Sequence, residues 1–273
     1  MNALAVRRLC KRYGPGCDSC FTSPPVDSNR CIDCGSIVAL RNVSFDLPAG
    51  ELVGIMGESG SGKSTLLRCL FFDDVPDDGS AVFRDGDVTC DLFTLNRAEA
   101  RKLKNRSFSI VHQNPRLGLN FRTTAGGNVA ERVLTAGHRN YRGIRATATR
   151  LLRRTRVPTD RIDELPGNFS GGMQQRVQIA KALSVHPAIL FLDEVTSGLD
   201  LSVQAQILDL IQELHQQLRL SILLVTHDIG VVKLLASQTM IMQHGTIVES
   251  GLTDQILEDP QHPYTQELVG AAL

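Results

Sequence analysis

Residues 57–64 read GESGSGKS and match the pattern G-x-x-x-x-G-K-[ST]. They follow a short apolar segment and precede a helical one, the context in which this pattern binds phosphate, and this disfavours a chance glycine-rich loop. The glycines let backbone N–H groups point at phosphate oxygens, and the helix start adds its dipole. Lys63 is expected to reach the β- and γ-phosphates, and Ser64 to bind Mg²⁺. The predicted nucleotide site comprises Gly57, Glu58, Ser59, Gly60, Ser61, Gly62, Lys63, Ser64 and Thr65.

Two acidic residues, Asp193 and Glu194, directly follow the apolar residues 189–192. Groups at the carboxyl end of a parallel strand face the ligand in open α/β sheets. Asp193 is therefore expected to hold Mg²⁺, directly or through water, and Glu194 to polarise an attacking water. Many buried strands end in acids, so this pattern gains its meaning from the phosphate-binding pattern that precedes it.

Four of the seven cysteines form two C-x-x-C pairs, Cys17 with Cys20 and Cys31 with Cys34. This spacing suits a tetrahedral Cys₄ zinc site, in which each tight turn supplies two thiolates. The segment between the pairs has few apolar residues, so a bound metal would supply its folding energy. Free thiols, a redox pair and an iron–sulfur centre are the alternatives. Cys10, Cys69 and Cys90 lie apart and are expected to be small apolar residues.

Short apolar strands alternate with helical segments, which predicts an α/β fold with a mostly parallel sheet covered on both faces. Strands are predicted at residues 1–13, 38–47, 51–56, 106–111, 189–192 and 222–225, with a hairpin over 240–247. Helices are predicted at residues 63–72, within 124–157, at 174–186 and along 203–218.

The chain has 273 residues, 42% of them hydrophobic, and a formal net charge of zero. This composition is globular, and the charge balance gives no sign of a nucleic-acid partner. No apolar run is long enough to span a membrane, and residues 1–12 lack a signal-peptide core. We therefore expect a cytoplasmic protein without a nucleic-acid partner.

Several further motifs resemble those of ATP-binding-cassette (ABC) ATPases. Residues 169–174 (FSGGMQ) resemble the family's signature loop, and residues 197–200 (SGLD) its D-loop. Gln113 resembles the Q-loop glutamine, His227 the switch histidine, and Tyr13 the aromatic residue that stacks on adenine. Together with the two phosphate-site motifs, they stand in the family's order along almost the whole chain.

The resemblance implies an ABC-type P-loop fold with a mixed, largely parallel sheet core, an antiparallel β lobe and a helical sub-domain. It implies ATP and Mg²⁺ as ligands, with Glu194, His227 and Gln113 in catalysis and Gln113 also at Mg²⁺. Ser170, Gly171 and Gly172 would bind the γ-phosphate held by a second ABC subunit, so the active form would be a dimer. The expected organisation is a single domain (residues 1–273) with a cysteine-rich insert (14–36) and a helical sub-domain (114–172).

Two positions depart from the family pattern. Val195 replaces a common proline, and since both favour extended backbone, little loss is expected. Met173 replaces a glutamine of the signature loop. We expect this change to be tolerated, because Ser170 and the backbone make the phosphate contacts.

Within the family, several stretches are similar to the K-type ATPase components of bacterial carbon–phosphorus lyase systems. This resemblance implies a partner in the lyase core complex; the alternative is a peptide-type or phosphonate importer, with a membrane permease as partner. An ATPase of repair or translation type is disfavoured, because such chains usually carry two cassettes. The stretches are residues 125–128 with 131–132, 169–183 (FSGGMQQRVQIAKAL), 201–211 (LSVQAQILDLI) and 248–265 (VESGLTDQILEDPQHPYT).

Eight arginines lie between Arg139 and Arg161. On a helical sub-domain such a cluster is either a solvated face or a surface for an acidic partner. A nucleic-acid partner is the least favoured interpretation of the cluster, because no aromatic residues interleave with the arginines. The sequence leaves open what ATP hydrolysis accomplishes, and whether the dimer is homo- or heteromeric.

Overall fold

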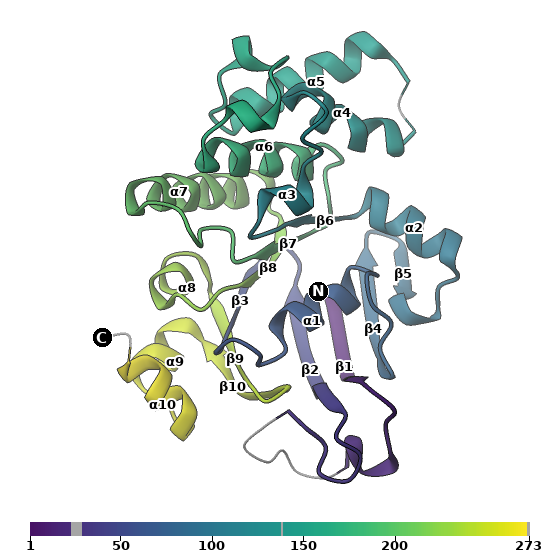
Figure 1. Cartoon of the computed structure of the whole chain (residues 1–273), viewed down its shortest axis with the longest axis vertical. Coiled ribbons are helices and arrows are strands. Elements are labelled where there is room, and N and C mark those ends of the chain that lie inside the picture. Colours follow the sequence, from purple (N-terminus) through teal and green to yellow (C-terminus); the bar gives the residue numbers. More distant parts are fainter. Residues whose placement is uncertain (23–28, 138, 272–273) are drawn as a thin grey trace. The chain divides into compact units, whose positions relative to one another are not determined.

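The computed structural model describes residues 1–22, 29–137 and 139–271. The chain divides into two compact units, one formed by Met1–Ala100 with Ser221–Leu273 and the other by residues 101–220. Figure 1 labels their elements. Residues 23–28 of the predicted insert, residue 138 of the predicted helical sub-domain and the terminal residues 272–273 lie outside the described residues.

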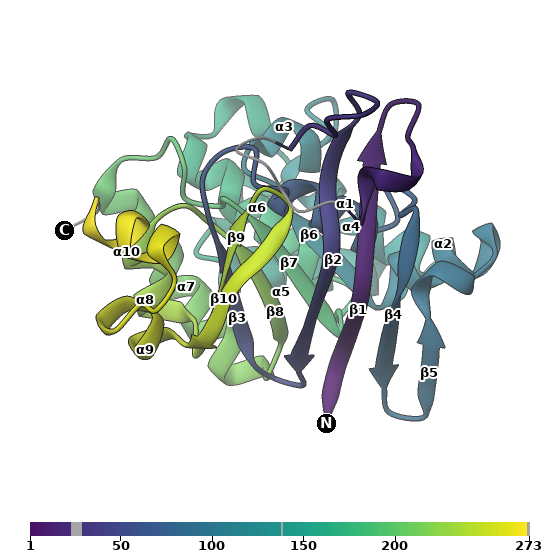
Figure 2. The same cartoon turned by 90° about the horizontal axis from the view of Figure 1, so that it is seen from below.

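The first unit contains an antiparallel sheet of four strands. These are β1 (Asn2–Tyr13), β2 (Ile37–Pro48), β4 (Asp78–Asp85) and β5 (Val88–Asp91). They lie in the order β2-β1-β4-β5, as Figure 2 shows. The predicted strands at residues 1–13 and 38–47 are confirmed as β1 and β2, whereas β4 and β5 were not predicted from the sequence.

A second group of strands in the first unit carries the phosphate-binding loop. Its order is β10-β9-β3-β8. All five residues of β3 (Leu52–Met56) and of β8 (Ser221–Val225) are buried, as continuous apolar runs in parallel sheets predict. β9 (Gln238–Gln243) and β10 (Thr246–Leu252) form the predicted hairpin. The helices of this unit are α1 (Lys63–Leu70), α8 (Ile229–Leu235), α9 (Thr253–Glu258) and α10 (Pro263–Gly270).

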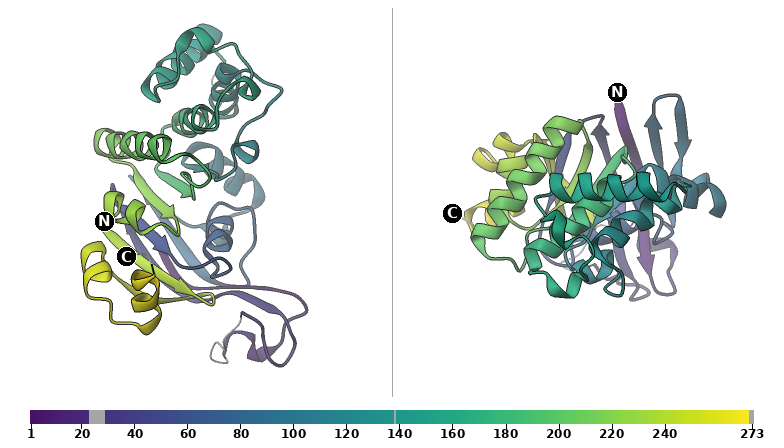
Figure 3. Two further views of the ribbon diagram at one scale, coloured as in Figure 1. Left: turned by 60° about the vertical axis from the view of Figure 1, so that its left-hand side comes forward. Right: turned by 90° about the horizontal axis from the view of Figure 1, so that it is seen from above.

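The second unit combines two parallel strands with helices, which Figure 3 shows in teal and green. β6 (Phe108–Val111) pairs with β7 (Ile189–Asp193). α4 (Ala125–Thr135), α5 (Tyr141–Arg154) and α6 (Gly171–Leu183) pack against one another, and α6 also contacts α7 (Leu201–Leu218) and the short α3 (Pro115–Gly118). On α5, Ile144, Ala148, Leu151 and Leu152 are buried, as their helical spacing predicts.

Some predicted boundaries were wrong. The strand expected from Arg106 begins at Phe108, because α2 (Arg97–Arg106) extends through Arg106. The helix expected from Gln174 begins at Gly171, since Ser170 caps it by accepting a hydrogen bond from the Met173 N–H. The fold class predicted from the sequence is confirmed: parallel strands, an antiparallel sheet and a helical region are all present. No helix in the described ranges has both the length and the hydropathy to span a bilayer.

Candidate functional site

The phosphate-binding loop joins β3 to α1 in a conformation that depends on glycine. Gly57 and Gly62 have φ values of +144° and +106°, which L side chains rarely adopt. A Cβ atom on Gly57 would lie 2.1 Å from the carbonyl oxygen of Met242, and one on Gly62 would lie 2.3 Å from that of Ala39. The loop therefore packs against neighbouring backbone at points where only glycine fits.

Lys63 is buried, and its ammonium lies inside this loop. Its Nζ donates to the carbonyl oxygens of Gly57 (2.7 Å) and Glu58 (2.8 Å). Ser64, the next residue, is exposed in the first turn of α1. An ammonium held among backbone groups at a helix start has the charge and donors that a polyphosphate needs, so the loop fits a nucleotide.

His227 and the phosphate-binding loop follow neighbouring parallel strands. β3 pairs with β8 from Leu52 opposite Ile222 to Ile55 opposite Val225. The Thr226 N–H donates to the carbonyl of Ile55 at 3.1 Å. His227, which is exposed, therefore emerges at the same sheet edge as Gly57, the edge where ligands bind in α/β folds.

Tyr13 ends β1, and its hydroxyl is anchored. The hydroxyl donates to the carboxylate of Asp74 and accepts from Arg68 at 3.3 Å. The ammonium of Lys11 lies 5.1 Å from the ring centroid. Burial is the main cause that raises the pKa of Tyr13, and the hydrogen bond to Asp74 adds to it.

In the second unit, Gln113 follows β6, and the two acids lie at the end of the adjacent parallel strand, β7. The Gln113 Nε2 donates to Glu194 Oε2 at 3.1 Å. The Ser197 hydroxyl, from the predicted D-loop, donates to the same oxygen at 3.1 Å. The structure thus brings together Gln113, Glu194 and Ser197, of which only the first two were predicted site residues.

Glu194 has a left-handed backbone with φ of +46°, an unusual conformation for a residue other than glycine. The Ser197 N–H donates to the Glu194 carbonyl at 3.1 Å and closes the turn. Strained backbone of this kind persists where its surroundings hold it in place, and it is common at functional sites. Asp193 ends β7 and is half-buried.

Two buried glutamines of α6, missed by the sequence analysis, position Gln113. Gln178 accepts from the His112 N–H at 2.7 Å and donates to the His112 carbonyl at 3.0 Å. Gln175 donates to the same carbonyl at 3.2 Å. Both glutamines are 1% exposed. Their buried amides hold the residue before Gln113, and the only sequence signal was their polarity on an otherwise apolar helix face.

The predicted signature loop forms the start of α6. Ser170 is its N-cap and is exposed, as is Gly171, so their polar groups face solvent at the positive end of a thirteen-residue helix. A Cβ on Gly172 would lie 2.3 Å from the Val203 side chain of α7. Gly172 is therefore needed for helix packing, and Ser170 and Gly171 are available to an anion.

A profile of the ABC transporter family matches residues 40–197. This chain belongs to that family. It is an ATPase that binds ATP and Mg²⁺, as the family does. A dimeric ATP-binding cassette solved in a post-hydrolysis state with ADP and Pi has a TM-score of 0.75 and 26% identity, covering 92% of this chain and 98% of that one.

Two relatives illustrate the range of named functions. The phosphonates utilization ATP-binding protein PhnK of Escherichia coli (strain K12) is 48% identical over 232 residues, covering 85% of this chain and 90% of that protein. The dipeptide transport ATP-binding protein DppF of the same organism is 37% identical over 235 residues, covering 86% of this chain and 69% of that protein.

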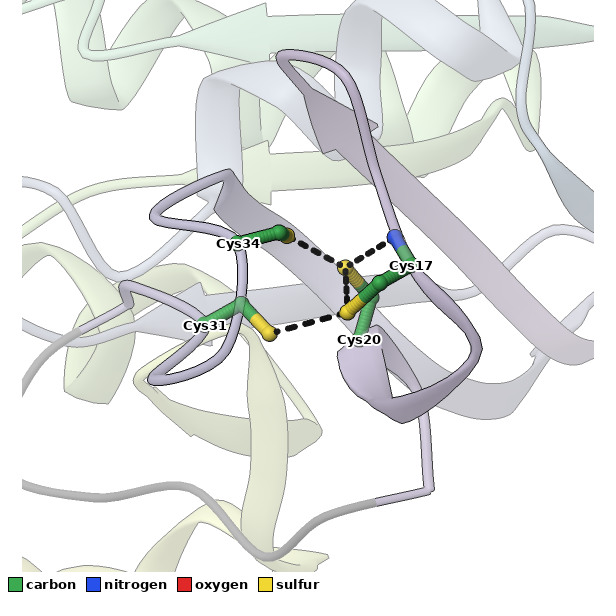
Figure 4. Close-up of side chains that lie close together, drawn as sticks. All are labelled: Cys17, Cys20, Cys31 and Cys34. Carbon is green, nitrogen blue, oxygen red and sulfur yellow. Dashed lines mark hydrogen bonds between the residues drawn. The ribbon is translucent and has the colours of Figure 1, made fainter.

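The cysteine pairs of this ABC ATPase lie before the matched residues and form one cluster. All four Sγ atoms lie within 4.8 Å of one another. Cys17 Sγ lies 3.8 Å from Cys20 Sγ and 3.5 Å from Cys31 Sγ, and Cys20 and Cys34 are also 3.5 Å apart, as Figure 4 shows. A tetrahedral ion with metal–sulfur bonds of about 2.3 Å requires sulfurs about 3.8 Å apart. The cluster therefore fits a single metal ion.

Hydrogen bonds distinguish the thiols within the cluster. The hydroxyl and backbone of Ser36 lower the pKa of Cys34 to about 6. The Ser36 Oγ accepts from the Gly16 N–H at 2.9 Å and lies 3.2 Å from the Cys34 Sγ. Burial and hydrogen bonds to neighbouring thiols raise the pKa of Cys17 to about 12. The lowered pKa favours the thiolate form of Cys34, which is the form that binds metal.

Proposed function

We propose that this ABC ATPase drives the phosphonate carbon–phosphorus lyase complex in organophosphonate breakdown, acting in the cytoplasm. The observation that carries the proposal is the 48% identity, over nearly the full length of both chains, to a protein named for phosphonates utilization. The dipeptide transport relative is less similar and is covered less fully. An importer ATPase is the alternative that this second relative supports.

The roles proposed at the ATP site follow from the chemistry of each side chain. Lys63 and the loop amides bind the β- and γ-phosphates, Tyr13 stacks on adenine, and His227 contacts the γ-phosphate. Glu194 orients the attacking water; its carboxylate is held by Gln113 and Ser197, so it meets the water in a defined position. In addition, Ser170, Gly171 and Gly172 of a second ABC subunit are proposed to contact the γ-phosphate.

Magnesium, when bound, neutralises charge on the phosphates. We propose Ser64, Asp193 and Gln113 as its protein ligands. The hydrogen bond to Glu194 uses the Nε2 of Gln113, and the oxygen of the same amide is the atom that can bind a cation. Hydroxyl, carboxylate and amide oxygens are the ligands that Mg²⁺ prefers.

A surface on α4 and α5 supports the proposed docking of the lyase core. A cavity of about 390 Å³ lies between these helices, lined by residues that include Ala130, Leu134 and Ile144. Tyr141 at its rim is 72% exposed.

Four of the eight arginines bond to polar side chains within the second unit. These bonds join Arg145 to Asp163, Arg154 to Gln217, Arg156 to Glu213 and Arg161 to Glu164. For Arg142 and Arg153, both exposed, the described residues contain no ion pair, so their charges are available to an acidic partner.

Reversing both charges, Arg142→Glu with Arg153→Glu, is expected to weaken co-purification of the lyase core several-fold at physiological salt. Exposed charges act within about 8 Å under these conditions, so they steer docking more than they hold it. ATP binding should be unchanged. The matched control is Arg84→Glu, an exposed arginine on β4. Equal recovery of the core with both variants would contradict a docking role for this surface.

Deleting the gene is expected to abolish growth on an alkylphosphonate as sole phosphorus source, while growth on phosphate stays normal. The lyase proposal requires that labelled alkylphosphonate still enters the deleted strain, because uptake would not depend on this ATPase. The two measurements separate the candidate functions. Loss of phosphonate or peptide uptake, with the protein sedimenting with membranes, would establish the importer alternative.

We also propose that Cys17, Cys20, Cys31 and Cys34 bind one zinc ion. The close packing of the four sulfurs supports a single ion. In an iron–sulfur cluster that places each thiolate on a different iron, the cysteine sulfurs lie farther apart. The buried apolar residues among the described part of this region are Cys20, Cys31 and Val38, with Phe21 packed against them, too few to stabilise it without a metal. Elemental analysis of the purified chain should find about one zinc, and no iron, per chain.

A further inference from the structure

The second cysteine turn contacts the phosphate-binding loop through Asn29. The Asn29 Nδ2 donates to the carbonyl of Gly60 at 2.7 Å. The Asn29 Oδ1 lies 3.2 Å from Nδ1 of His244, in the β9–β10 turn. Because Gly60 O is only an acceptor, the amide orientation is determined, and His244 must donate from Nδ1.

The bond to Gly60 determines the direction of a loop N–H group. A trans peptide group is planar, so its carbonyl and its N–H point in opposite directions. By holding the Gly60 carbonyl, Asn29 turns the Ser61 N–H the other way, where it donates to the Glu58 carbonyl at 3.2 Å. The Gly245 N–H meanwhile donates to the Ser61 carbonyl at 3.0 Å. Asn29 and the β9–β10 turn thus hold two successive peptides of the loop.

Asn29 is tied to the cysteine cluster by a short backbone path. Arg30 forms a β-bridge with Ile37, and the Asn29 carbonyl accepts from the Val38 N–H at 2.6 Å. Cys31 then closes its turn, with its N–H donating to the Ser36 carbonyl at 2.8 Å and its carbonyl accepting from Gly35 at 2.9 Å. The position of Asn29 therefore depends on the order of a turn that two metal ligands would hold.

We propose that zinc in the Cys₄ site positions Asn29 against Gly60 and thereby sets the affinity of the phosphate-binding loop for nucleotide. Asn29 is a positioning residue: it acts through the loop peptides and needs no contact with ATP. The inference rests on the proposed zinc site. By linkage, bound nucleotide must also strengthen zinc retention by the same factor.

The test measures MgADP affinity for the full chain with and without zinc, in the wild type and in Asn29→Ala. Zinc is stripped with a chelator, which is then removed before Mg²⁺ is restored. Losing one hydrogen bond should weaken MgADP binding about 3- to 10-fold in Asn29→Ala, with zinc content unchanged. Zinc removal should weaken MgADP binding by the wild type at least as much. It should weaken MgADP binding by Asn29→Ala only slightly more, because the two changes interrupt the same path. MgADP should also slow zinc loss to a chelator in the wild type but not in Asn29→Ala.

The control variant is Ile32→Ala, because Ile32 directly follows Cys31 in the chain and is 76% exposed. It should keep both zinc and wild-type affinity. The inference is overturned if the zinc-free and the zinc-loaded wild type bind MgADP equally. It is also overturned if zinc removal lowers the MgADP affinity of the wild type and of Asn29→Ala by the same factor. A chain that takes up no added zinc overturns both the zinc site and its coupling, so metal content separates the two failures.

Discussion

Glu194→Gln is expected to lower ATP hydrolysis by a factor of about 100 or more while ATP binding survives. The amide keeps the size of the carboxylate and one oxygen that can accept from Gln113 and Ser197, so the site geometry should persist. The amide cannot take a proton from the attacking water. With hydrolysis blocked and the γ-phosphate intact, the ATP-bound dimer should accumulate.

Steady-state phosphate release and size-exclusion chromatography with saturating MgATP measure the two effects. Glu213→Gln is the matched control, since Glu213 on α7 pairs with Arg156 at the surface and has no proposed role in hydrolysis. A Glu194→Gln protein that stays monomeric and hydrolyses ATP at the wild-type rate would contradict the assignment. Loss of nucleotide binding would instead mean that Glu194 acts in binding.

Cys31→Ser is expected to reduce zinc from about one ion per chain to almost none. Cys31 is 6% exposed, and its sulfur lies 3.5 Å from Cys17 Sγ, so the hydroxyl would replace one thiolate in a close-packed set of four. A serine hydroxyl does not ionise near neutral pH and is a poor ligand for zinc. Residues 14–22 and 29–36 should lose their order, whereas the strands and helices beyond them should remain folded, because they have their own apolar cores.

Elemental analysis and limited proteolysis check this result. The matched control is Cys90→Ser, a cysteine in β5 outside the cluster, which should leave the zinc content unchanged. Four freely titrating thiols and no metal in the reduced wild type would rule out the metal site. Iron in place of zinc would keep the four ligands but change the identity of the ion.

Features that depend on neighbours along the chain were predictable from the sequence. The phosphate-binding loop was recognisable because its glycines, Lys63 and Ser64 act within one turn between a strand and a helix. The four-cysteine cluster was likewise visible in its spacing, since each C-x-x-C pair lies in one tight turn. The parallel strands were predictable because burial on both faces requires continuous apolar runs such as those of β3 and β8.

Features that depend on register and close packing became visible only in the tertiary structure. Gln113 and Glu194 are far apart in the chain, and the parallel pairing of β6 with β7 places the residues that follow them together. The sequence alone is equally compatible with Gln175 and Gln178 at the surface. Only the packing of α6 shows that they are buried against His112. Asn29 shows no motif at all. Its contact with Gly60 exists because folding brings the cysteine-rich turn to the phosphate-binding loop, and a side-chain hydrogen bond over such a separation leaves no periodic or spacing signal in the sequence.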